Sequence, residues 1–500
     1  MLFNQPIPLQ SFKQWLLLDT ENKRLFWFSL IIMIVSFGLL KFTYPYPNFL
    51  QPDSMYYEEA ALKNDFINYW PIGYSKFLRL VSVFSRSHLL LVLLQYLLLM
   101  ASVLYFLFTI RYLLSPGKWL FRSLLTVSIF NPLLPHIANI VSSDCLFTTL
   151  SLVWFTQLLW ILYRPNLRLL LFHALILTFA FMVRFSAIWY PFISIPVILL
   201  ISIPNRNRWL SLASIITFLL LFIDCTEYEY HKITRTTQYA AFGGWQMAAN
   251  ALYAYAYADP IDPGKVPHQF QNLHAVVNHH MDSIRTLADR PDQEIGIYYL
   301  WMYQSPLKQF AKHQWQKDLK TPLFIKWASM GPLYGAYGRW LITQHPWLFI
   351  KHFAWPNLMR YYQPPTVSLA MYNLGDPTVD SITVTWFNWK NNQLPGRFQS
   401  PKISVMTLFT PLLAVINTLF ICSVLIFLFF SGLKQCSPTN KNILSIIMMV
   451  WLGNLFFSVV SAPTELRYQI FPIIITLPFC LFIVAWLIQV SKTESAASLV

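Results

Sequence analysis

Apolar runs of near-membrane length alternate with short polar segments over most of the chain. A helix needs about 20 mostly apolar residues to cross a hydrocarbon core of about 30 Å, and about ten runs approach this length. They cover residues 25–43, 87–110, 119–135, 145–163, 167–185, 187–203, 208–224, 404–431, 442–461 and 469–490. The pattern predicts an all-α polytopic membrane protein with about ten transmembrane helices.

Two of the short runs, the third and the sixth, contain prolines. Pro132 and Pro135 fall in the third run, and Pro191 and Pro196 in the sixth. Because proline lacks a backbone donor, the bounds of these two helices are the least sharply defined. No basic segment precedes the first run in the manner of a cleaved signal, since the first basic residue is Lys13. We expect that run to remain as a membrane helix after a cytoplasmic segment, residues 1–24.

Basic residues gather in alternate short loops, which sets the orientation. Short cytoplasmic loops carry an excess of lysine and arginine. The basic segments contain Lys13, Lys23, Arg24, Arg111, Lys118, Arg122, Arg164, Arg168, Arg206, Arg208, Lys434 and Lys441. This threading places both termini in the cytoplasm, including a tail at 491–500.

Two longer segments then lie on the outer face, residues 44–86 and 225–403. The second contains 16 Lys and Arg, 11 Asp and Glu, and eight of the 11 histidines. We expect it to be a water-facing, mainly helical extracytoplasmic domain between the bundle at 25–224 and the C-terminal helices at 404–490. Within it, residues 340–362 mix tryptophan and aliphatic residues with lysine and arginine, which is typical of a helix in the membrane interface.

Composition agrees with this class. Apolar residues make up 56% of the chain and charged residues 11%, whereas globular chains carry roughly a quarter charged residues. The net charge of +15 follows from the basic loops, so we expect no nucleic-acid partner. Five cysteines without a CxxC pair provide neither a disulfide framework nor a thiolate metal cluster.

Two aspartates stand out in the predicted outer loops. Asp53 follows Pro52 and precedes an acidic, aromatic stretch, and Asp144 lies at the predicted outer end of the fourth span. Charges at such positions are costly and usually functional. The alternative for each is a structural role as a helix N-cap, for which aspartate is well suited.

Charged residues also occur at the outer ends of two later spans. Arg184 interrupts an apolar run, and Glu465 and Arg467 precede the last one. The alternatives are an arginine that snorkels to the interface and a structural Glu–Arg ion pair. The topology places all five charges at one membrane face, which favours a common site.

Two arginines and two aspartates at a lipid–water boundary suit a lipid-linked phosphate substrate. Arginine binds phosphate through paired donors and keeps its charge in a low-dielectric site. A nearby carboxylate can act as general base on an incoming hydroxyl. The phosphate would then be the leaving group.

In these motifs the chain resembles the GT-C class of integral-membrane glycosyltransferases, which includes the protein O-mannosyltransferases and the aminoarabinose transferases that modify lipid A. The motifs are QPDSMYYEEAA, WPIGYSKFL, SSDCLF, VRFSAIWYP and ELRYQIFP. The first four motifs lie before residue 225 and the last lies after residue 403. The resemblance therefore does not cover most of residues 225–403.

The resemblance implies transfer of a sugar from a polyprenyl-phosphate donor, with inversion, to an acceptor that is a lipid, a glycan or a protein. It implies catalytic roles for Asp53 and Asp144 and donor-phosphate binding by Arg184 and Arg467. Apart from the resemblance, Glu58 and Glu59 lie about one helical turn after Asp53 and are candidates for a second carboxylate, and Tyr56 and Glu465 are further supporting candidates. The first loop departs from the pattern, because Ser54 and Met55 follow Asp53 where an adjacent carboxylate is expected. Direct metal binding there is therefore doubtful, and a divalent cation stays an open cofactor.

The outer region holds two further candidates. The stretch at 239–259 combines glycines, small residues and tyrosines, so Trp245 and Tyr253 are candidates for a sugar or acceptor cleft; the alternative is a packed helix. In a histidine-rich stretch, His274 and His279 are weak metal candidates without an HExxH signature.

The sequence therefore predicts a membrane glycosyltransferase, with its active site facing the periplasm of a bacterial inner membrane. One alternative is an enzyme like the O-antigen ligases or polymerases. Another is a transporter or flippase, which predicts ionisable groups at mid-membrane and repeated, interrupted helices. A structural assembly protein would tolerate loss of Asp53.

Overall fold

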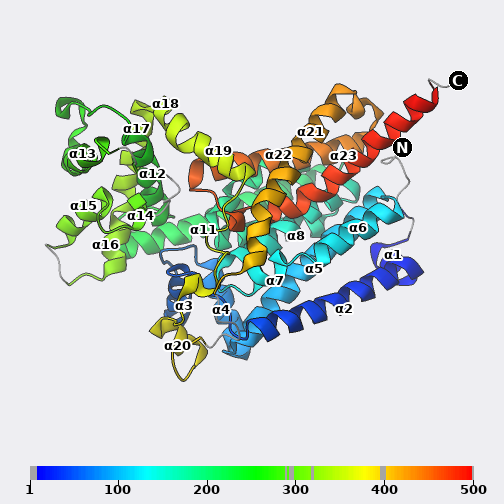
Figure 1. Ribbon diagram of the computed structural model, residues 1–500, viewed down its shortest axis with the longest axis horizontal. Helices are drawn as coiled ribbons and strands as arrows, with labels where there is room; N and C mark the ends of the chain where they lie inside the picture. Colours follow the sequence, from blue (N-terminus) through cyan, green and yellow to red (C-terminus); the bar gives the residue numbers. More distant parts are fainter. Residues whose placement is uncertain are drawn as a thin grey trace.

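A computed structural model of the chain describes residues 8, 10–287, 290–291, 298–316, 320–394 and 401–497 (Figure 1). The structure is 77% helical, and its described residues form no strand. Three isolated bridges join loops, among them one between Asn48 and Ile140. The predicted all-α class is confirmed.

Seven described helices are long and apolar enough to cross a membrane, which indicates a membrane protein. They are α2 (Thr20–Thr43), α5 (His88–Leu114), α8 (Ser143–Tyr163), α11 (Asn205–Thr234), η7 with α21 (Ser404–Leu408 and Phe409–Phe429), α22 (Pro438–Ser461) and α23 (Ile470–Ala497). Short α1 (Phe12–Leu18) precedes them.

The other three predicted spans form shorter helices. The run at 119–135 is split into α6 (Lys118–Ile129) and α7 (Leu133–Ala138), with Pro132 between them. The run at 167–185 is α9 (Leu167–Val183), and the run at 187–203 is η1 (Phe185–Trp189) followed by α10 (Pro191–Leu200). None reaches 18 residues, so ten crossings stay a prediction.

The core of the bundle lies around α5, α8 and α9, which pack against one another. These helices are apolar on every side, and more than half of the apolar stretch of α5 and of α8 is buried. By contrast, α2 and α11 expose large apolar side chains such as Ile34 and Leu221, as expected of surfaces that face lipid.

The outer region forms a separate group of helices at one end of the bundle, at the left in Figure 1. Its elements are α12 (Ala241–Tyr255), η2 (Pro263–Lys265), η3 (His268–Phe270), α13 (Gln271–Arg285), α14 (Tyr298–Trp301), α15 (Pro306–Trp315), α16 (Leu323–Ser329) and α17 (Gly331–Gln344). Helix α11 runs ten residues past the predicted domain boundary at 224. At the centre, α12 packs closely on α17, because a Cβ at Gly338 would lie 2.6 Å from the backbone of Met247.

The predicted interfacial segment is helical from Pro346 to Tyr362. It comprises α18 (Pro346–Phe349), the π-helical turn η5 (Ile350–Ala354) and α19 (Trp355–Tyr362). Trp347, Ile350, Trp355 and Met359 are exposed along it. Its position in a membrane interface stays a prediction.

Three more helices cover the end of the bundle that is predicted to face outward: α3 (Asp53–Lys63), α4 (Gly73–Phe84) and α20 (Ser381–Phe387). The short helices η6 (Tyr372–Gly375), η8 (Gly432–Gln435) and η9 (Leu466–Tyr468) lie in loops. Helix α1 and the C-terminal end of α23 lie at the far end of the bundle from α12–α17 (Figure 1). This arrangement agrees with the predicted placement of both termini on one side.

Candidate active site

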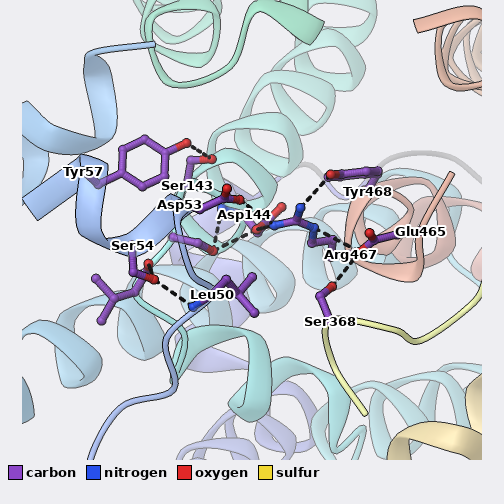
Figure 2. A network of polar contacts seen from close by, with 12 residues as sticks. Leu50, Asp53, Ser54, Tyr57, Ser143, Asp144, Ser368, Glu465, Arg467 and Tyr468 are labelled. Atoms are coloured by element: carbon purple, nitrogen blue, oxygen red, sulfur yellow. Dashed lines mark hydrogen bonds and ion pairs between the residues drawn. The ribbon is translucent and has the colours of Figure 1, made fainter. Parts of the chain in front are cut away.

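Five charged side chains from four separate parts of the sequence meet where apolar helices end. Figure 2 labels four of them, Asp53, Asp144, Glu465 and Arg467. Asp53 begins α3, Asp144 lies in the first turn of α8, Arg184 follows the last residue of α9, and Glu465 and Arg467 lie just before α23. All five were singled out from the sequence. The structure brings them into one connected network of ion pairs.

Backbone contacts between two loops place the aspartates side by side. The Asn48 amide donates to the Asn139 carbonyl at 2.8 Å, and the Val141 amide donates to the Asn48 carbonyl at 3.0 Å. The Ser54 hydroxyl donates to the Val141 carbonyl at 2.7 Å. The start of α3 is thereby fixed to the segment that leads into α8.

A side-chain contact strengthens this junction. The Tyr57 hydroxyl, one turn after Asp53, donates to Ser143 Oγ at 2.9 Å (Figure 2). Tyr57 is buried, so this bond is shielded from water. The position of Asp53 relative to Asp144 is therefore set by several contacts.

Neither aspartate is an N-cap. The N-cap of α3 is Pro52, and the Asp53 side chain makes no cap hydrogen bond. The N-cap of α8 is Ser142, whose Oγ accepts from the Asp144 amide and donates to Asp144 Oδ2 at 2.8 Å. Both carboxylates are instead directed toward arginines.

Arg184 is anchored inside the protein. Its guanidinium donates to Asp144 Oδ1 and lies 5.6 Å from the centre of the Phe147 ring and 4.8 Å from that of Tyr468. The side chain is 22% exposed. These contacts correspond to an internal ion pair and differ from the snorkelling alternative.

Gly73 allows Arg184 to lie where it does. Gly73 opens α4 in the stretch WPIGYSKFL, and a Cβ there would lie 2.6 Å from the backbone carbonyl of Met182. The beginning of α4 therefore contacts the end of α9 directly. Only glycine lets the two backbones approach this closely.

Arg467 is the centre of the network, and each of its three guanidinium nitrogens lies close to a polar partner (Figure 2). Its Nη1 donates to Asp53 Oδ2 at 3.0 Å and lies 3.7 Å from Asp144 Oδ2. Its Nε pairs with Glu465 Oε2 at 3.2 Å. Its Nη2 donates to the Tyr468 hydroxyl at 2.7 Å. One guanidinium thus contacts three carboxylates.

The segment that carries Arg467 is held by the loop after α19. The Leu466 amide donates to the Pro365 carbonyl at 3.0 Å, and the Ser368 hydroxyl donates to Glu465 Oε2 at 2.6 Å. The Glu–Arg ion pair considered from the sequence exists, and it is one arm of the larger network.

Burial and neighbouring charge act on these groups in opposite directions. Burial raises the pKa of Asp53 above its ordinary value, although Arg467 lowers it. Burial lowers the pKa of Arg467, but Tyr468 and the three carboxylates raise it more, so the guanidinium stays charged. The carboxylates outnumber the arginines by one.

The supporting residues on α3 lie outside this network. Glu58 is buried and accepts a hydrogen bond of 2.5 Å from the Thr383 hydroxyl of α20. Glu59 pairs with Lys63, and Tyr56 stacks on Tyr69 at 4.1 Å between ring centres. Glu58 and Glu59 therefore point away from Asp53 and toward Thr383 and Lys63. The other carboxylates that contact Arg467 are those of Asp144 and Glu465.

The predicted cleft residues Trp245 and Tyr253 are in the interior. Trp245 is fully buried, and its Nε1 donates to the Trp327 carbonyl at 2.9 Å. Tyr253 is 1% exposed and packs on Tyr299 and Phe353. The cleft prediction is wrong for this pair, since the small residues of α12 allow close packing on α17 and leave these rings in the core.

The two metal candidates do not converge. His274 is buried with its Nδ1 2.8 Å from the Tyr337 hydroxyl, whereas His279 is exposed. Among the residues that the structure describes, no group of three or more His, Cys, Asp or Glu side chains is placed to hold a metal ion. The three carboxylates of the network are bridged by Arg467.

Two residues of the site, Tyr468 and Ser368, were not singled out in the sequence analysis. Tyr468 contacts both arginines, and Ser368 fixes Glu465 from nearly 100 residues away. Tyr468 stands directly beside Arg467 in ELRYQIFP, so that motif was the available signal. Ser368 lies in a region with no motif.

Comparisons with protein-family models, curated proteins and solved structures found no match to this chain.

Proposed function

We propose that this protein is an integral-membrane glycosyltransferase of GT-C architecture. It transfers a sugar from a polyprenyl-phosphate donor to an acceptor hydroxyl on the extracytoplasmic face, in a bacterial inner membrane. The observation that carries the proposal is the junction of Arg184 and Arg467 with Asp53 and Asp144 where apolar helices end. The phosphate of a lipid-linked substrate lies at the boundary between the membrane and water, which is where apolar helices end.

The chemistry assigns a role to each group. The acceptor oxygen attacks the anomeric carbon, and its proton passes to Asp53. The bond between the anomeric carbon and the phosphate oxygen breaks, and its electron pair leaves with the phosphate. Arg467 and Arg184 stabilise the charge that develops on that phosphate, while Asp144 holds Arg184 in place. Attack opposite the leaving group inverts the anomeric centre.

The test is sugar transfer from a panel of polyprenyl-phosphate sugars by the purified protein in detergent, read by mass spectrometry. We expect Asp53→Asn to lower kcat by at least about a hundredfold, as general-base removal does. Arg467→Ala should be similarly impaired. Asp282→Asn and Arg339→Ala are matched controls, because Asp282 pairs with Arg285 on α13 and Arg339 is exposed on α17, both outside the network.

The outcomes separate the alternatives. Activity of the wild type and both controls, with loss in the two site variants, supports the proposal. If every donor stays intact in the presence of acceptor extract, the proposal is rejected and the transporter alternative gains. If Asp53→Asn is as active as the wild type, Asp53 is not the base.

A further inference from the structure

The arginine assigned to the donor phosphate is already occupied. Arg467 Nη1 donates to Asp53 and Nη2 donates to the Tyr468 hydroxyl, while Nε lies 3.2 Å from Glu465 Oε2 as an ion pair without a hydrogen bond. A phosphate bound by arginine takes two adjacent donors. Each pair of adjacent donors includes a nitrogen that already has a partner, so a phosphate bound in this way competes with at least one of them.

The three carboxylates around Arg467 differ in how firmly they are held. Asp144 is 2% exposed and is also fixed by the Ser142 hydroxyl and by Arg184. Glu465 is fixed by the Ser368 hydroxyl at 2.6 Å. For Asp53, the described residues offer a single hydrogen-bonding partner, Arg467 itself. Asp53 is the partner that can leave.

Charge balance favours an exchange. Three carboxylates and two arginines leave one net negative charge in the network. Binding of a phosphodiester would raise the net negative charge of the site from one to two unless a carboxylate moves away. Like charges in a poorly solvated site repel strongly. Withdrawal of Asp53 from Arg467 lets the phosphate take the vacated guanidinium edge.

We propose that the donor phosphate binds Arg467 by displacing Asp53, so that donor binding releases the base. This inference rests on the proposed function. The freed carboxylate loses its ion-pair partner and is available to accept the proton of the acceptor hydroxyl. Before the donor arrives, Arg467 holds Asp53 through a hydrogen bond to Oδ2 and lowers its basicity. The order is donor first, then acceptor.

The test measures binding of a polyprenyl phosphate that carries no sugar to the full-length protein in detergent, by the change in tryptophan fluorescence. Asp53→Asn removes the competitor, so we expect it to bind the lipid about tenfold more tightly than the wild type while its kcat falls. A residue that is only a base would change kcat and leave Kd unchanged. A residue that positions the donor would, when removed, weaken binding.

Two variants separate displacement from a general loss of negative charge. Glu465→Gln takes the same charge from Arg467 but leaves Asp53 in place, so its gain in affinity should be several-fold smaller. Asp282→Asn removes an aspartate paired with an arginine at 2.8 Å outside the site and should bind as the wild type does. Asp53→Ala serves as a second variant if Asp53→Asn does not fold.

The outcomes distinguish this inference from the proposed function. Tighter binding by Asp53→Asn or Asp53→Ala than by Glu465→Gln supports displacement. Equal or weaker binding than the wild type, or an equal gain in Glu465→Gln, overturns displacement and leaves the glycosyltransferase proposal standing. If the wild type binds no polyprenyl phosphate, the proposed function fails, and displacement fails with it.

Discussion

Tyr468 holds the two arginines of the site in relation to each other. Both guanidinium carbons lie 4.8 Å from the centre of its ring, and its hydroxyl accepts from Arg467 Nη2. The ring contributes a cation–π contact on an apolar support, and the hydroxyl fixes the rotation of one guanidinium. The two contributions can be separated by substitution.

We expect Tyr468→Phe to raise the KM for the donor by about three- to tenfold and to leave kcat nearly unchanged. The ring stays and one hydrogen bond to a charged group, worth about 1 kcal/mol or somewhat more, is lost. Tyr468→Leu, which removes the ring as well, should raise KM further. Steady-state kinetics with the donor varied at saturating acceptor checks both. A fall in kcat with unchanged KM in Tyr468→Phe would contradict a role confined to positioning.

Glu58 gives the outer end of the bundle a pH-dependent stability. Burial raises its pKa to about 8 from an ordinary 4.5, and its Oε1 has no hydrogen-bond partner among the described residues. The folded state therefore holds a proton that the unfolded chain releases between pH 4.5 and 8. Stability from this group is full below the lower pKa and falls as the pH rises through that window.

We expect Glu58→Gln to raise the unfolding temperature at pH 8 and to change it little at pH 4.5. The amide keeps an acceptor for the Thr383 hydroxyl and cannot ionise. The gain in unfolding free energy at pH 8 should be a few kcal/mol, since each unit of pKa corresponds to about 1.4 kcal/mol. Thermal unfolding in detergent at both pH values measures it. Glu59→Gln, which affects a partly exposed carboxylate paired with Lys63, is the control, and a gain independent of pH would contradict this account.

At the scale of elements, the contact between α4 and α9 sets the position of Arg184. Gly73→Ala would place a methyl group 2.6 Å from the backbone of Met182, two residues before Arg184. Overpacking of this kind costs about 1–3 kcal/mol. We expect lower thermal stability and lower sugar transfer in this variant, because α9 must shift.

Gly38→Ala is the matched control, because nothing lies within 4 Å of a Cβ at Gly38 in α2. It should be neutral or slightly stabilising. Thermal unfolding and transfer assays on both variants make the comparison. If Gly73→Ala were as stable and as active as Gly38→Ala, close packing at this point would not position the site.

The charged residues of the network could be found from the sequence because they interrupt apolar runs. Asp144 and Arg184 are conspicuous against their surroundings, and one orientation put them at one face. Their partners within the network could not be assigned, because pairing depends on loop contacts such as that between Asn48 and Asn139. Glu58 was chosen as a supporting carboxylate because it lies about one helical turn after Asp53. Helical spacing does not show where a neighbouring helix such as α20 packs, and Glu58 contacts that helix.

Elements rich in small residues were the hardest to interpret. Glycine, alanine and tyrosine in α12 fit either a cleft or a tightly packed helix, and only the position of α17 decides between them. Apolar length alone also predicted the span at 119–135, which is divided at Pro132. The all-α class needed only the apolar pattern and was predicted correctly.

At the scale of the whole molecule, the two ends of the helical bundle differ, and the orientation of the bundle in the membrane limits which substrates can reach the site. The helices α12–α17 lie at one end of the bundle, and α1 and the C-terminal end of α23 lie at the other (Figure 1). The basic segment around the turn between α5 and α6, with Arg111 near the end of α5 and Lys118 at the start of α6, belongs to the predicted cytoplasmic side. A lipid-linked sugar presented at the outer face can reach Asp53 only if this orientation holds.

We expect alkaline phosphatase fused after Pro260 to be active in a bacterial host and the same enzyme fused after Pro116 to be inactive, because this reporter folds only outside the cytoplasm. A fluorescent protein fused after Ala497, near the end of α23, should give the reverse signal, since it shares a side with Pro116. If the fusion after Pro116 were active and the fusion after Pro260 inactive, the network would face the cytoplasm. In that orientation soluble nucleotide sugars compete with lipid-linked ones as donors, and the case for a polyprenyl-phosphate substrate loses its topological support even if Arg467 binds phosphate.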